Sequence, residues 1–385
     1  MSDLVAQIEA CYAQEQQSPQ RPVYDPSELP RSFEAITTEW LTHVLCADVA
    51  DAEVTAVHLG SASTGTSNRR RIRVEYNEIG RAAQLPTALF CKATHELANR
   101  IVLGVSTGAF SEVTFYRDIR AQLAIEAPRS YFAAIDLLSF NSLVILEDLT
   151  DTVTEFCSHT TVMTRERAES QIALLAGLHA RFFGRVDDDP TLRTLADWPQ
   201  FFGGTLDHGM KEGSNQGFLD GEDLIPARLY RRYEQIWPKT LESVALHRTT
   251  PKTLAHGDVH LRNWYVTAGG AMGLGDWQCL HRGHWARDFG YAITTALTVD
   301  DRRRWEEELL RLYLDRLRAA GGPQISYATA FLAYRQQLLT ALTWWTITLH
   351  PAPGMPDMQP RDSTEEFIRR ISTAMDDVDS LDSFD

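Results

Sequence analysis

Short apolar runs in the first 150 residues favour β-strands. Strands are predicted over 54–59, 71–76 and 88–94, with a further pair around 131–138 and 143–146. Each run has the length of a typical strand. We therefore expect a β-sheet in this part of the chain.

Helical periodicity dominates from about residue 150 onwards. Helices are predicted over 164–183, 301–320 and 327–349, where apolar residues recur every three or four positions. A capping box at 363–366 predicts the start of a last helix. The acidic run 376–379 is expected to lie in a solvated tail.

Three further segments complete this pattern. Residues 1–30 begin with an amphipathic stretch and then become rich in Gln and Pro, which predicts an extension over the surface. A helix is expected within 33–45, with Thr37 or Thr38 as its N-cap. Another helix is predicted to follow Ser111, which would cap it.

Composition limits the classes of partner. The chain has 385 residues, 44% of them hydrophobic, which favours a sizeable core and two or three domains. A formal charge of −15 and a pI of about 5.3 argue against a nucleic-acid partner. No apolar run has the length of a membrane span, and the first residues lack the apolar segment of a signal peptide.

Cysteine usage indicates the compartment. The cysteines are scattered and form no Cys-x-x-Cys pair; they are Cys11, Cys46, Cys91, Cys157 and Cys279. An odd number without a pattern indicates free thiols in a reducing compartment. We therefore expect a cytoplasmic protein without a membrane partner.

The clearest candidate chemistry lies around a predicted hairpin. Segments 264–267 and 271–274 are apolar, and a Gly-Gly pair between them can form a tight turn. A hairpin of this length brings Asn263 and Asp276 side by side, and Asp258 lies one loop turn earlier. An acid, an amide and a second acid are thus expected to converge.

These three side chains suit phosphoryl transfer to a hydroxyl group. Asp258 would accept or orient the proton of the attacking hydroxyl. Asn263 and Asp276 would hold Mg²⁺ against the phosphates of a nucleotide. The competing interpretation of a His-Gly-Asp tripeptide is ordinary turn chemistry.

A zinc site is a further alternative. His256, Asp258 and His260 could ligate zinc, with His281 and His284 nearby. Structural zinc sites usually have four nitrogen or sulfur ligands, and hydrolytic ones carry motifs such as His-Glu-x-x-His. Neither pattern occurs here, so this interpretation ranks below phosphoryl transfer.

A lysine in an apolar strand suggests a second group of site residues. Lys92 interrupts the run 88–94, and burying an ammonium group is unfavourable unless it meets an anion. Glu112 lies on the apolar stripe of the next predicted helix and needs a cation for the same reason. We expect the two to pair; the alternative is an edge strand whose lysine faces water.

The loop between the first two predicted strands is rich in small residues. Within 60–68 it includes Thr64, Gly65, Thr66 and Ser67. Such residues let backbone amides approach a phosphate closely, and hydroxyls can add hydrogen bonds. An ordinary flexible hairpin is the alternative, because the Gly-x-Gly-x-x-Gly and Walker patterns are absent.

The C-terminal motif resembles that of a known family. His256, Asp258 and Asn263, followed by Asp276, have the spacing of a protein-kinase catalytic loop, but His-Gly-Asp replaces His-Arg-Asp and Asp-Trp-Gln replaces Asp-Phe-Gly. The chain resembles the aminoglycoside phosphotransferase and choline-kinase-like group of small-molecule kinases over about residues 54–350. This resemblance implies an α+β class and a two-lobed protein-kinase-like fold, with an antiparallel-sheet N-lobe and a mostly helical C-lobe.

The resemblance also implies a domain organisation. It assigns an N-terminal extension to 1–30, a nucleotide-binding N-lobe to 31–149, and a helical C-lobe with catalytic loop and substrate pocket to 150–385. The Asp-Phe-Gly at 288–290 follows no hairpin from Asn263. It is expected to open a helix in which Asp288 buttresses the catalytic loop.

ATP and Mg²⁺ are the cofactors that the resemblance implies. Lys92 would reach the α- and β-phosphates, oriented by Glu112, beside a phosphate-binding Ser-Thr-Gly-Thr loop. The segment 145–149 would be the hinge, where the backbone of Glu147 and Leu149 reads the adenine edge. His256 would hold the catalytic loop by hydrogen bonds.

The predicted function is ATP- and Mg²⁺-dependent phosphorylation of a hydroxyl group on a small molecule. A non-catalytic nucleotide-binding pseudokinase is the main alternative, and a zinc metallohydrolase is the lesser one. The group handles sugars, amino alcohols, antibiotics, sterols and lipid-like alcohols. Aromatic residues within 190–250 and 327–350 favour a bulky or apolar alcohol over a polycationic aminoglycoside.

Overall fold

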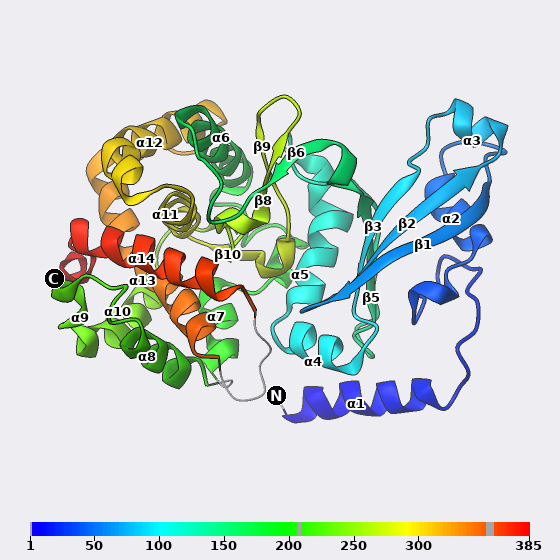
Figure 1. Cartoon of the computed structure of the whole chain (residues 1–385), viewed down its shortest axis with the longest axis horizontal. Helices are drawn as coiled ribbons and strands as arrows, with labels where there is room; N and C mark the ends of the chain where they lie inside the picture. Colours follow the sequence, from blue (N-terminus) through cyan, green and yellow to red (C-terminus); the bar gives the residue numbers. More distant parts are fainter. Residues whose placement is uncertain (1, 207–208, 352–357) are drawn as a thin grey trace. The chain divides into compact units, whose positions relative to one another are not determined.

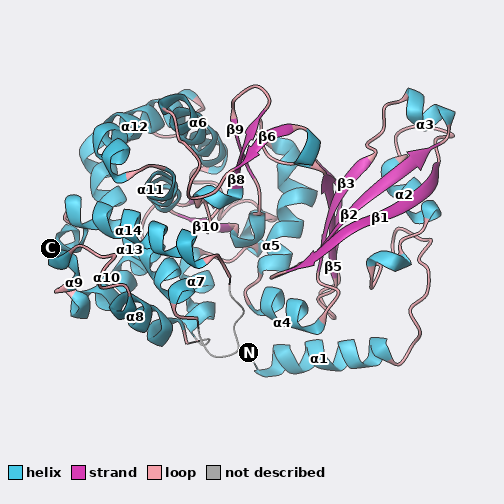
Figure 2. Cartoon of the chain, viewed as in Figure 1, coloured by secondary structure: helices cyan, strands magenta, loops and turns pink. Residues whose placement is uncertain are grey.

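The structure, a computed structural model, describes residues 2–206, 209–351 and 358–385 (Figure 1). The chain forms two compact units. Unit 1 comprises Met1–Gln122 and Pro128–Thr152, and unit 2 comprises Leu123–Ala127 and Val153–Asp385. Unit 1 contains the large sheet, whereas unit 2 is mostly helical (Figure 2). Within the described ranges, no helix is both long and apolar enough to cross a membrane.

Unit 1 is built on a five-stranded sheet in the order β1-β2-β3-β5-β4, with every neighbouring pair antiparallel. The predicted sheet is therefore confirmed. Its strands are β1 (Val54–Thr64), β2 (Asn68–Tyr76), β3 (Ala88–Ala93), β4 (Ser130–Ile135) and β5 (Ser142–Glu147).

The connection between β1 and β2 is shorter than the sequence predicts. Thr64 pairs with Asn68, so Thr64 belongs to β1 and the loop consists of residues 65–67. A register shift between Leu59 and Ala62 places one extra residue in β1, and beyond it the ladder continues past the expected strand end.

One face of this sheet carries the core of unit 1 and is covered by α2 (Thr38–Leu45). Thr37 caps α2 by accepting a hydrogen bond from the backbone N–H of Trp40, at 3.1 Å, which decides between the two predicted caps. Trp40 is fully buried in this core. The other core members include Ile72, Val74, Leu89, Cys91, Leu143 and Ile145.

The remaining helices of unit 1 lie around this sheet. They are α1 (Ser2–Gln16), η1 (Phe33–Ala35), α3 (Glu78–Ala82), α4 (Leu97–Val105), α5 (Gly108–Thr114), the π-helical turn η2 (Phe115–Ile119), and the 3-10 turns η3 (Arg120–Gln122) and η4 (Leu149–Asp151). The prediction that Ser111 caps a helix is wrong, because α5 already begins at Gly108. Thr107 has a φ of 61°, and this left-handed residue separates α4 from α5.

Unit 2 is a helical assembly with two small sheets, ordered β6-β8-β9 and β10-β7. Its strands are β6 (Val153–Phe156), β7 (Thr253–Ala255), β8 (Trp264–Thr267), β9 (Met272–Leu274) and β10 (His281–Gly283). Its helices are α6 (Arg165–Phe182), α7 (Trp198–Leu206), α8 (Met210–Asp220), α9 (Ala227–Tyr230), α10 (Tyr233–Leu246), α11 (Trp285–Ala296), α12 (Val299–Ala319), α13 (Tyr327–Leu349) and α14 (Arg361–Asp377). Shorter 3-10 turns are η5 (Leu192–Thr194), η6 (Leu261–Asn263), η7 (Trp277–Cys279) and η8 (Ser380–Phe384). The three long helices predicted for this region, α6, α12 and α13, are confirmed.

The end of unit 2 differs from the prediction in two ways. Helix α14 begins at Arg361, so Ser363 lies inside its first turn and no capping box forms. The Ser363 hydroxyl bonds His159 Nδ1 at 2.8 Å instead. The acidic run is not a solvated tail, because Asp376 pairs with Arg228 at 2.8 Å and the following η8 packs against α13.

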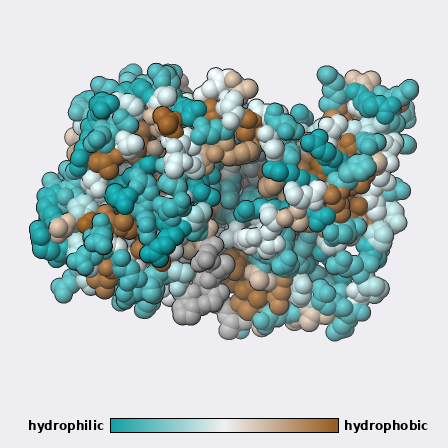
Figure 3. All heavy atoms as spheres, viewed as in Figure 1, coloured by the Kyte–Doolittle hydropathy of each residue, from teal (hydrophilic) through white to brown (hydrophobic). Residues whose placement is uncertain are grey.

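The aromatic residues after α6 form a core cluster. Trp198, Phe201 and Phe202 of α7 are buried and pack with Trp344 of α13. Packing is thus the main role of these rings. On the face shown in Figure 3, hydrophilic side chains predominate and hydrophobic ones form scattered patches, in keeping with the acidic composition.

Candidate functional site

The predicted hairpin is present in unit 2 and places Asn263 opposite Gly275, the residue before Asp276. Strands β8 and β9 pair antiparallel, and Gly270 takes a φ of 83° in the turn. The N–H of Gly275 donates to the carbonyl of Asn263 at 2.9 Å. Asp276 follows with a φ of 57°, a left-handed conformation that Asp adopts more readily than most residues.

Asn263 contacts the first acid of the motif directly. Its Nδ2 donates to the backbone carbonyl of Asp258 at 2.7 Å and lies 3.1 Å from Asp258 Oδ2. His260 Nε2 lies 3.3 Å from the same oxygen, and the Tyr291 hydroxyl donates to Oδ1 at 3.2 Å. Both carboxylate oxygens are therefore oriented, while 23% of the side chain stays exposed.

The charge state of Asp258 follows from these neighbours. Burial by itself would raise its pKa, but His260, His256 and Arg287 favour the charged form more strongly, so the pKa lies below its usual range. Asp258 is therefore a carboxylate at neutral pH. A carboxylate with a low pKa is suited to orienting a hydroxyl group and is a weak base.

His256 connects the loop of Asp258 to the hairpin. Its Nδ1 accepts a hydrogen bond from the N–H of Asp258 at 3.2 Å, and its Nε2 lies 2.9 Å from the carbonyl of Gly275. Because Nδ1 accepts, this network assigns the proton to Nε2. Complete burial lowers the pKa of His256 and keeps the ring neutral. These hydrogen bonds hold the loop in the way the sequence predicts for His256.

The first turn of α11 clamps the same loop. Asp288 accepts hydrogen bonds from the N–H groups of His256, at 2.6 Å, and Gly257, at 3.0 Å, which confirms the predicted buttress. Arg287 donates to the carbonyl of Gly257 and lies over the ring of Trp198, with its guanidinium carbon 3.9 Å from the ring centroid.

Two residues of this network were missed by the sequence reasoning. Tyr291 lies three residues after Asp288 on a predicted helix, and residues three apart lie on the same helix face. This spacing could have indicated that Tyr291 lies near the catalytic loop. Arg287 precedes Asp288, but no pattern in the sequence indicates that a guanidinium is buried there.

In unit 1, Lys92 and Glu112 form the predicted pair. Lys92 Nζ lies 2.5 Å from Glu112 Oε1, and the two side chains are 7% and 5% exposed. The alternative of an edge strand is wrong, because β3 lies between β2 and β5. Two buried charges thus satisfy each other on one face of the sheet.

Helix α4 holds the loop between β1 and β2. Asn99 Nδ2 donates to the carbonyls of Gly65 and Thr66, at 2.8 and 2.9 Å. Asn68, directly after the loop, accepts two hydrogen bonds from backbone N–H groups at the start of α4. The hydroxyl of Ser67 is buried and has no partner in the part of the chain that the structure describes.

The predicted hinge follows β5 in the same unit. The side chain of Glu147 accepts a hydrogen bond from the N–H of Arg129 at 2.6 Å, so it is fixed against the chain leading into β4. Leu149 begins η4, which Asp148 caps by accepting from the N–H of Thr150 at 3.0 Å.

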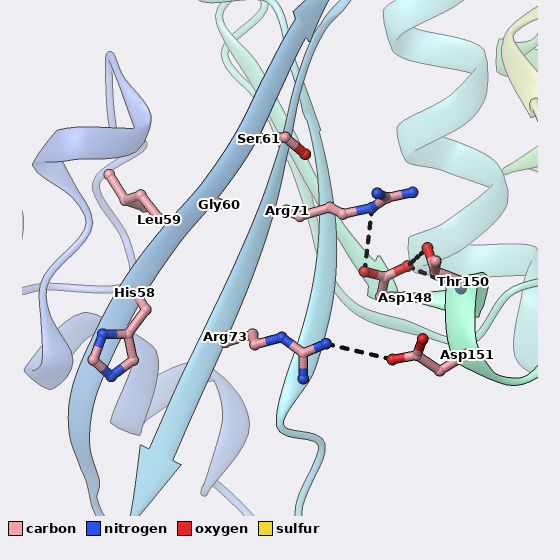
Figure 4. Close-up of a pocket in the computed structure, with 9 residues that line it drawn as sticks. All are labelled: His58, Leu59, Gly60, Ser61, Arg71, Arg73, Asp148, Thr150 and Asp151. Atoms are coloured by element: carbon pink, nitrogen blue, oxygen red, sulfur yellow. Dashed lines mark hydrogen bonds and ion pairs between the residues drawn. The ribbon is translucent and has the colours of Figure 1, made fainter.

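A pocket of about 220 Å³ lies in unit 1 beside this segment (Figure 4). Two ion pairs cross it, Arg71–Asp148 at 3.4 Å and Arg73–Asp151 at 3.3 Å. Its remaining lining consists of His58, Leu59, Gly60, Ser61 and Thr150. Most of the lining residues are therefore polar or charged.

The zinc alternative finds no support in the geometry. Across residues 2–206, 209–351 and 358–385, no three His, Cys, Asp or Glu side chains gather into a group that could hold a metal ion. Both ring nitrogens of His256 are engaged by backbone groups, and His281 Nδ1 lies 2.9 Å from the carbonyl of Cys279.

Residues 116–323, more than half of the chain, match the model of the phosphotransferase enzyme family. The chain belongs to this family. The matched range contains Asp258, Asn263 and Asp276, and the predicted resemblance is confirmed.

Several solved structures align with this chain. The ethanolamine kinase of Plasmodium vivax aligns over 97% of this chain and 95% of its own, with a TM-score of 0.51 and 10% identity. A choline kinase of Streptococcus pneumoniae aligns over 86% and 94%, with a TM-score of 0.46 and 13% identity. An aminoglycoside phosphotransferase of Streptomyces rimosus aligns over 71% and 90%, with a TM-score of 0.42 and 15% identity. The first of these, together with the sheet and helices of the two units, confirms the predicted α+β kinase-like fold. No curated protein matches the sequence.

Proposed function

We propose that this phosphotransferase transfers the γ-phosphoryl group of ATP to a hydroxyl group of a small molecule. The observation that carries the proposal is the arrangement of Asp258, Asn263 and Asp276 around one hairpin in a chain of this family. The ethanolamine kinase of similar fold acts, by its name, on a small amino alcohol, which supports an acceptor of this size.

In the proposed reaction the acceptor oxygen forms a bond to the γ-phosphorus. The bond from that phosphorus to the bridging oxygen breaks, and ADP leaves with the electron pair. Asp258 accepts a hydrogen bond from the hydroxyl group and takes up its proton as the new bond forms. Because the pKa of Asp258 is low, Asp258 orients the nucleophile and does not deprotonate it before the bond to phosphorus forms.

Asn263 and Asp276 fit Mg²⁺ as ligands. Asn263 uses its Nδ2 on Asp258, so its Oδ1 is the remaining donor atom, and Asp276 adds a carboxylate. Both residues are partly exposed. Such oxygen ligands suit Mg²⁺, which when bound supplies positive charge against the phosphate oxygens.

The residues of unit 1 are proposed to bind the nucleotide. Lys92, held by Glu112, offers its ammonium group to the phosphates. Residues 64–67 would lie against the phosphates, and the backbone of Glu147 and Leu149 would meet the base. Because the hydroxyl of Ser67 is buried, Ser67 would contact a phosphate through its backbone.

Asp258→Asn tests the proposal. It keeps the shape of the side chain and removes the carboxylate, so we expect at least a hundredfold loss of ADP release in the presence of acceptor. The acceptor panel would include ethanolamine, choline, an aminoglycoside and apolar alcohols. Asp188→Asn, which changes an exposed aspartate of unit 2, is the matched control and should retain full activity.

Three outcomes would contradict the proposal. ATP and Mg²⁺ binding without turnover of any acceptor, or less than a tenfold loss in Asp258→Asn, would favour a pseudokinase. A melting temperature that ATP and Mg²⁺ leave unchanged at millimolar concentration would remove the nucleotide site altogether.

A further inference from the structure

Strand β2 presents arginines to the face of the sheet that carries Lys92. Arg69 pairs directly with Lys92 of β3, and directly opposite residues of an antiparallel pair point to the same face. Arg71 and Arg73 follow at the period of two that defines a strand face. Figure 4 shows these two side chains leaving β2 on the same side, toward Asp148 and Asp151.

Three of the four arginines of β2 have a carboxylate partner. Arg70, on the opposite face, lies 3.5 Å from Glu34. Arg71 and Arg73 pair across the pocket, at 3.4 and 3.3 Å. The side chain of Arg69 makes no ion pair or hydrogen bond with any residue that the structure describes.

The position of Arg69 is unfavourable for an unpaired cation. Like charges that lie directly opposite each other on a sheet repel, and Lys92 is the cross-strand neighbour of Arg69. Glu112 is already bound by Lys92 at 2.5 Å. Arg69 is also half-buried, so water screens its charge less than at an exposed site. An anion shared by both cations would remove this repulsion.

The guanidinium group of Arg69 lies beside the loop proposed to bind phosphate. Its Nη2 is 3.6 Å from the point where a Cβ on Gly65 would lie, and its central carbon is 3.8 Å from it. The guanidinium group therefore lies close to the loop at Gly65, with no side chain of residue 65 between them. A phosphate bound at this loop would meet both.

We propose that Arg69 is a second phosphate-binding cation, which contacts the terminal phosphates of the nucleotide beside Lys92. A guanidinium group presents parallel N–H donors that match phosphate oxygens. This inference rests on the proposed nucleotide site, and it assigns to that site a residue which no motif in the sequence indicates.

The test compares Arg69→Gln with Arg70→Gln by calorimetric titration. Both variants remove one arginine from β2, but Arg70 points to the other face. The probes are ATP, AMP and inorganic tripolyphosphate, each with Mg²⁺. In Arg69→Gln we expect Kd to rise about tenfold for ATP and tripolyphosphate and less than about twofold for AMP, with Arg69→Lys recovering part of the loss. In Arg70→Gln all three Kd values should match wild type.

The titrations distinguish a failure of the proposed role of Arg69 from a failure of the proposed function. Equal Kd values for ATP and tripolyphosphate in wild type and Arg69→Gln would overturn the role of Arg69 alone. An equal loss for AMP would also overturn it, because a general distortion of the sheet would then explain the effect. Wild-type protein that binds neither ATP nor tripolyphosphate would overturn the proposed function itself.

Discussion

A single glycine sets the turn that precedes Asp258. Gly257 has a φ of 85°, and both its N–H and its carbonyl are bound by the start of α11. A Cβ at this position would lie 2.4 Å from the carbonyl oxygen of Cys279 and 2.7 Å from His281 Nδ1. The backbone conformation and the lack of space both require glycine here.

Gly257→Ala is therefore expected to destabilise the protein and to displace Asp258. Gly270→Ala is the matched control, since Gly270 has a φ of 83° but no atom within 4 Å of the position that a Cβ would occupy. We expect a loss of about 1 kcal/mol in the free energy of unfolding for Gly270→Ala from strain alone. Gly257→Ala should lose about 1–3 kcal/mol more from the clash. Urea unfolding measures both, and equal losses would show that space at Gly257 does not matter.

At the scale of elements, α1 supports the loop between β1 and β2 through α4. Arg100 of α4 is fully buried and pairs with Glu15 at the end of α1, at 2.8 Å. The preceding residue, Asn99, holds the carbonyls of Gly65 and Thr66. Helices α1 and α4 lie side by side in unit 1 (Figure 1). The N-terminal segment thus braces the helix that fixes the proposed phosphate loop.

Glu15→Ala tests this support. The substitution leaves a buried guanidinium group without its carboxylate, which should cost about 1–3 kcal/mol of stability and loosen α4. Amide hydrogen exchange of residues 65–67 should then become faster. Glu9→Ala, an exposed position on the same helix, should leave the exchange unchanged. Unaltered exchange of the loop in Glu15→Ala would mean that α4 holds it without help from α1.

At the scale of the whole molecule, buried histidines make stability depend on pH. Burial lowers the pKa of His281 and of His284 to about 4, with Arg287 adding to the effect at His281 and His179 at His284. In the unfolded chain the ordinary histidine pKa is about 6.5. Between these values the unfolded state binds more protons, so the free energy of unfolding falls as the pH drops from about 6.5 to about 4.

We expect wild-type protein to lose about 2 kcal/mol of stability per buried histidine between pH 7.5 and pH 5. His284 caps α11 by accepting from the N–H of Ala286, and Asn can fill that role, so His284→Asn removes one titrating group and keeps a cap. Its pH dependence should be weaker by nearly one proton. Urea unfolding at both pH values, followed by tryptophan emission, measures this difference.

His43→Asn, which removes an exposed histidine and leaves both buried ones in place, is the matched control. The same pH dependence in wild type and His284→Asn would contradict the assignment of the buried ring. Below about pH 4, Asp258 and Asp288 should lower the stability further, because both carboxyl groups have a lowered pKa in the folded state and bind protons more readily in the unfolded chain.

The sequence by itself determined the elements whose signals are local. Helix α13 spans the predicted residues 327–349, a long segment rich in apolar residues that contains no glycine or proline to interrupt a helix. The hairpin of β8 and β9 was predicted from two apolar runs and a Gly-Gly turn, and in the structure Asn263 lies opposite Gly275, the residue before Asp276. Lys92 and Glu112 were paired by the argument that each buried charge needs the other.

Only the tertiary structure decided which competing local signals were used. Ser111 and Ser363 have cap-forming patterns, but a left-handed residue at Thr107 starts α5 earlier, and His159 takes the hydroxyl of Ser363. Likewise, the surroundings of Arg69 and the contact of Tyr291 with Asp258 depend on which strands and helices meet. A capping or charged side chain can bind one of several partners. Partners that are distant in sequence come within reach only when the chain has folded.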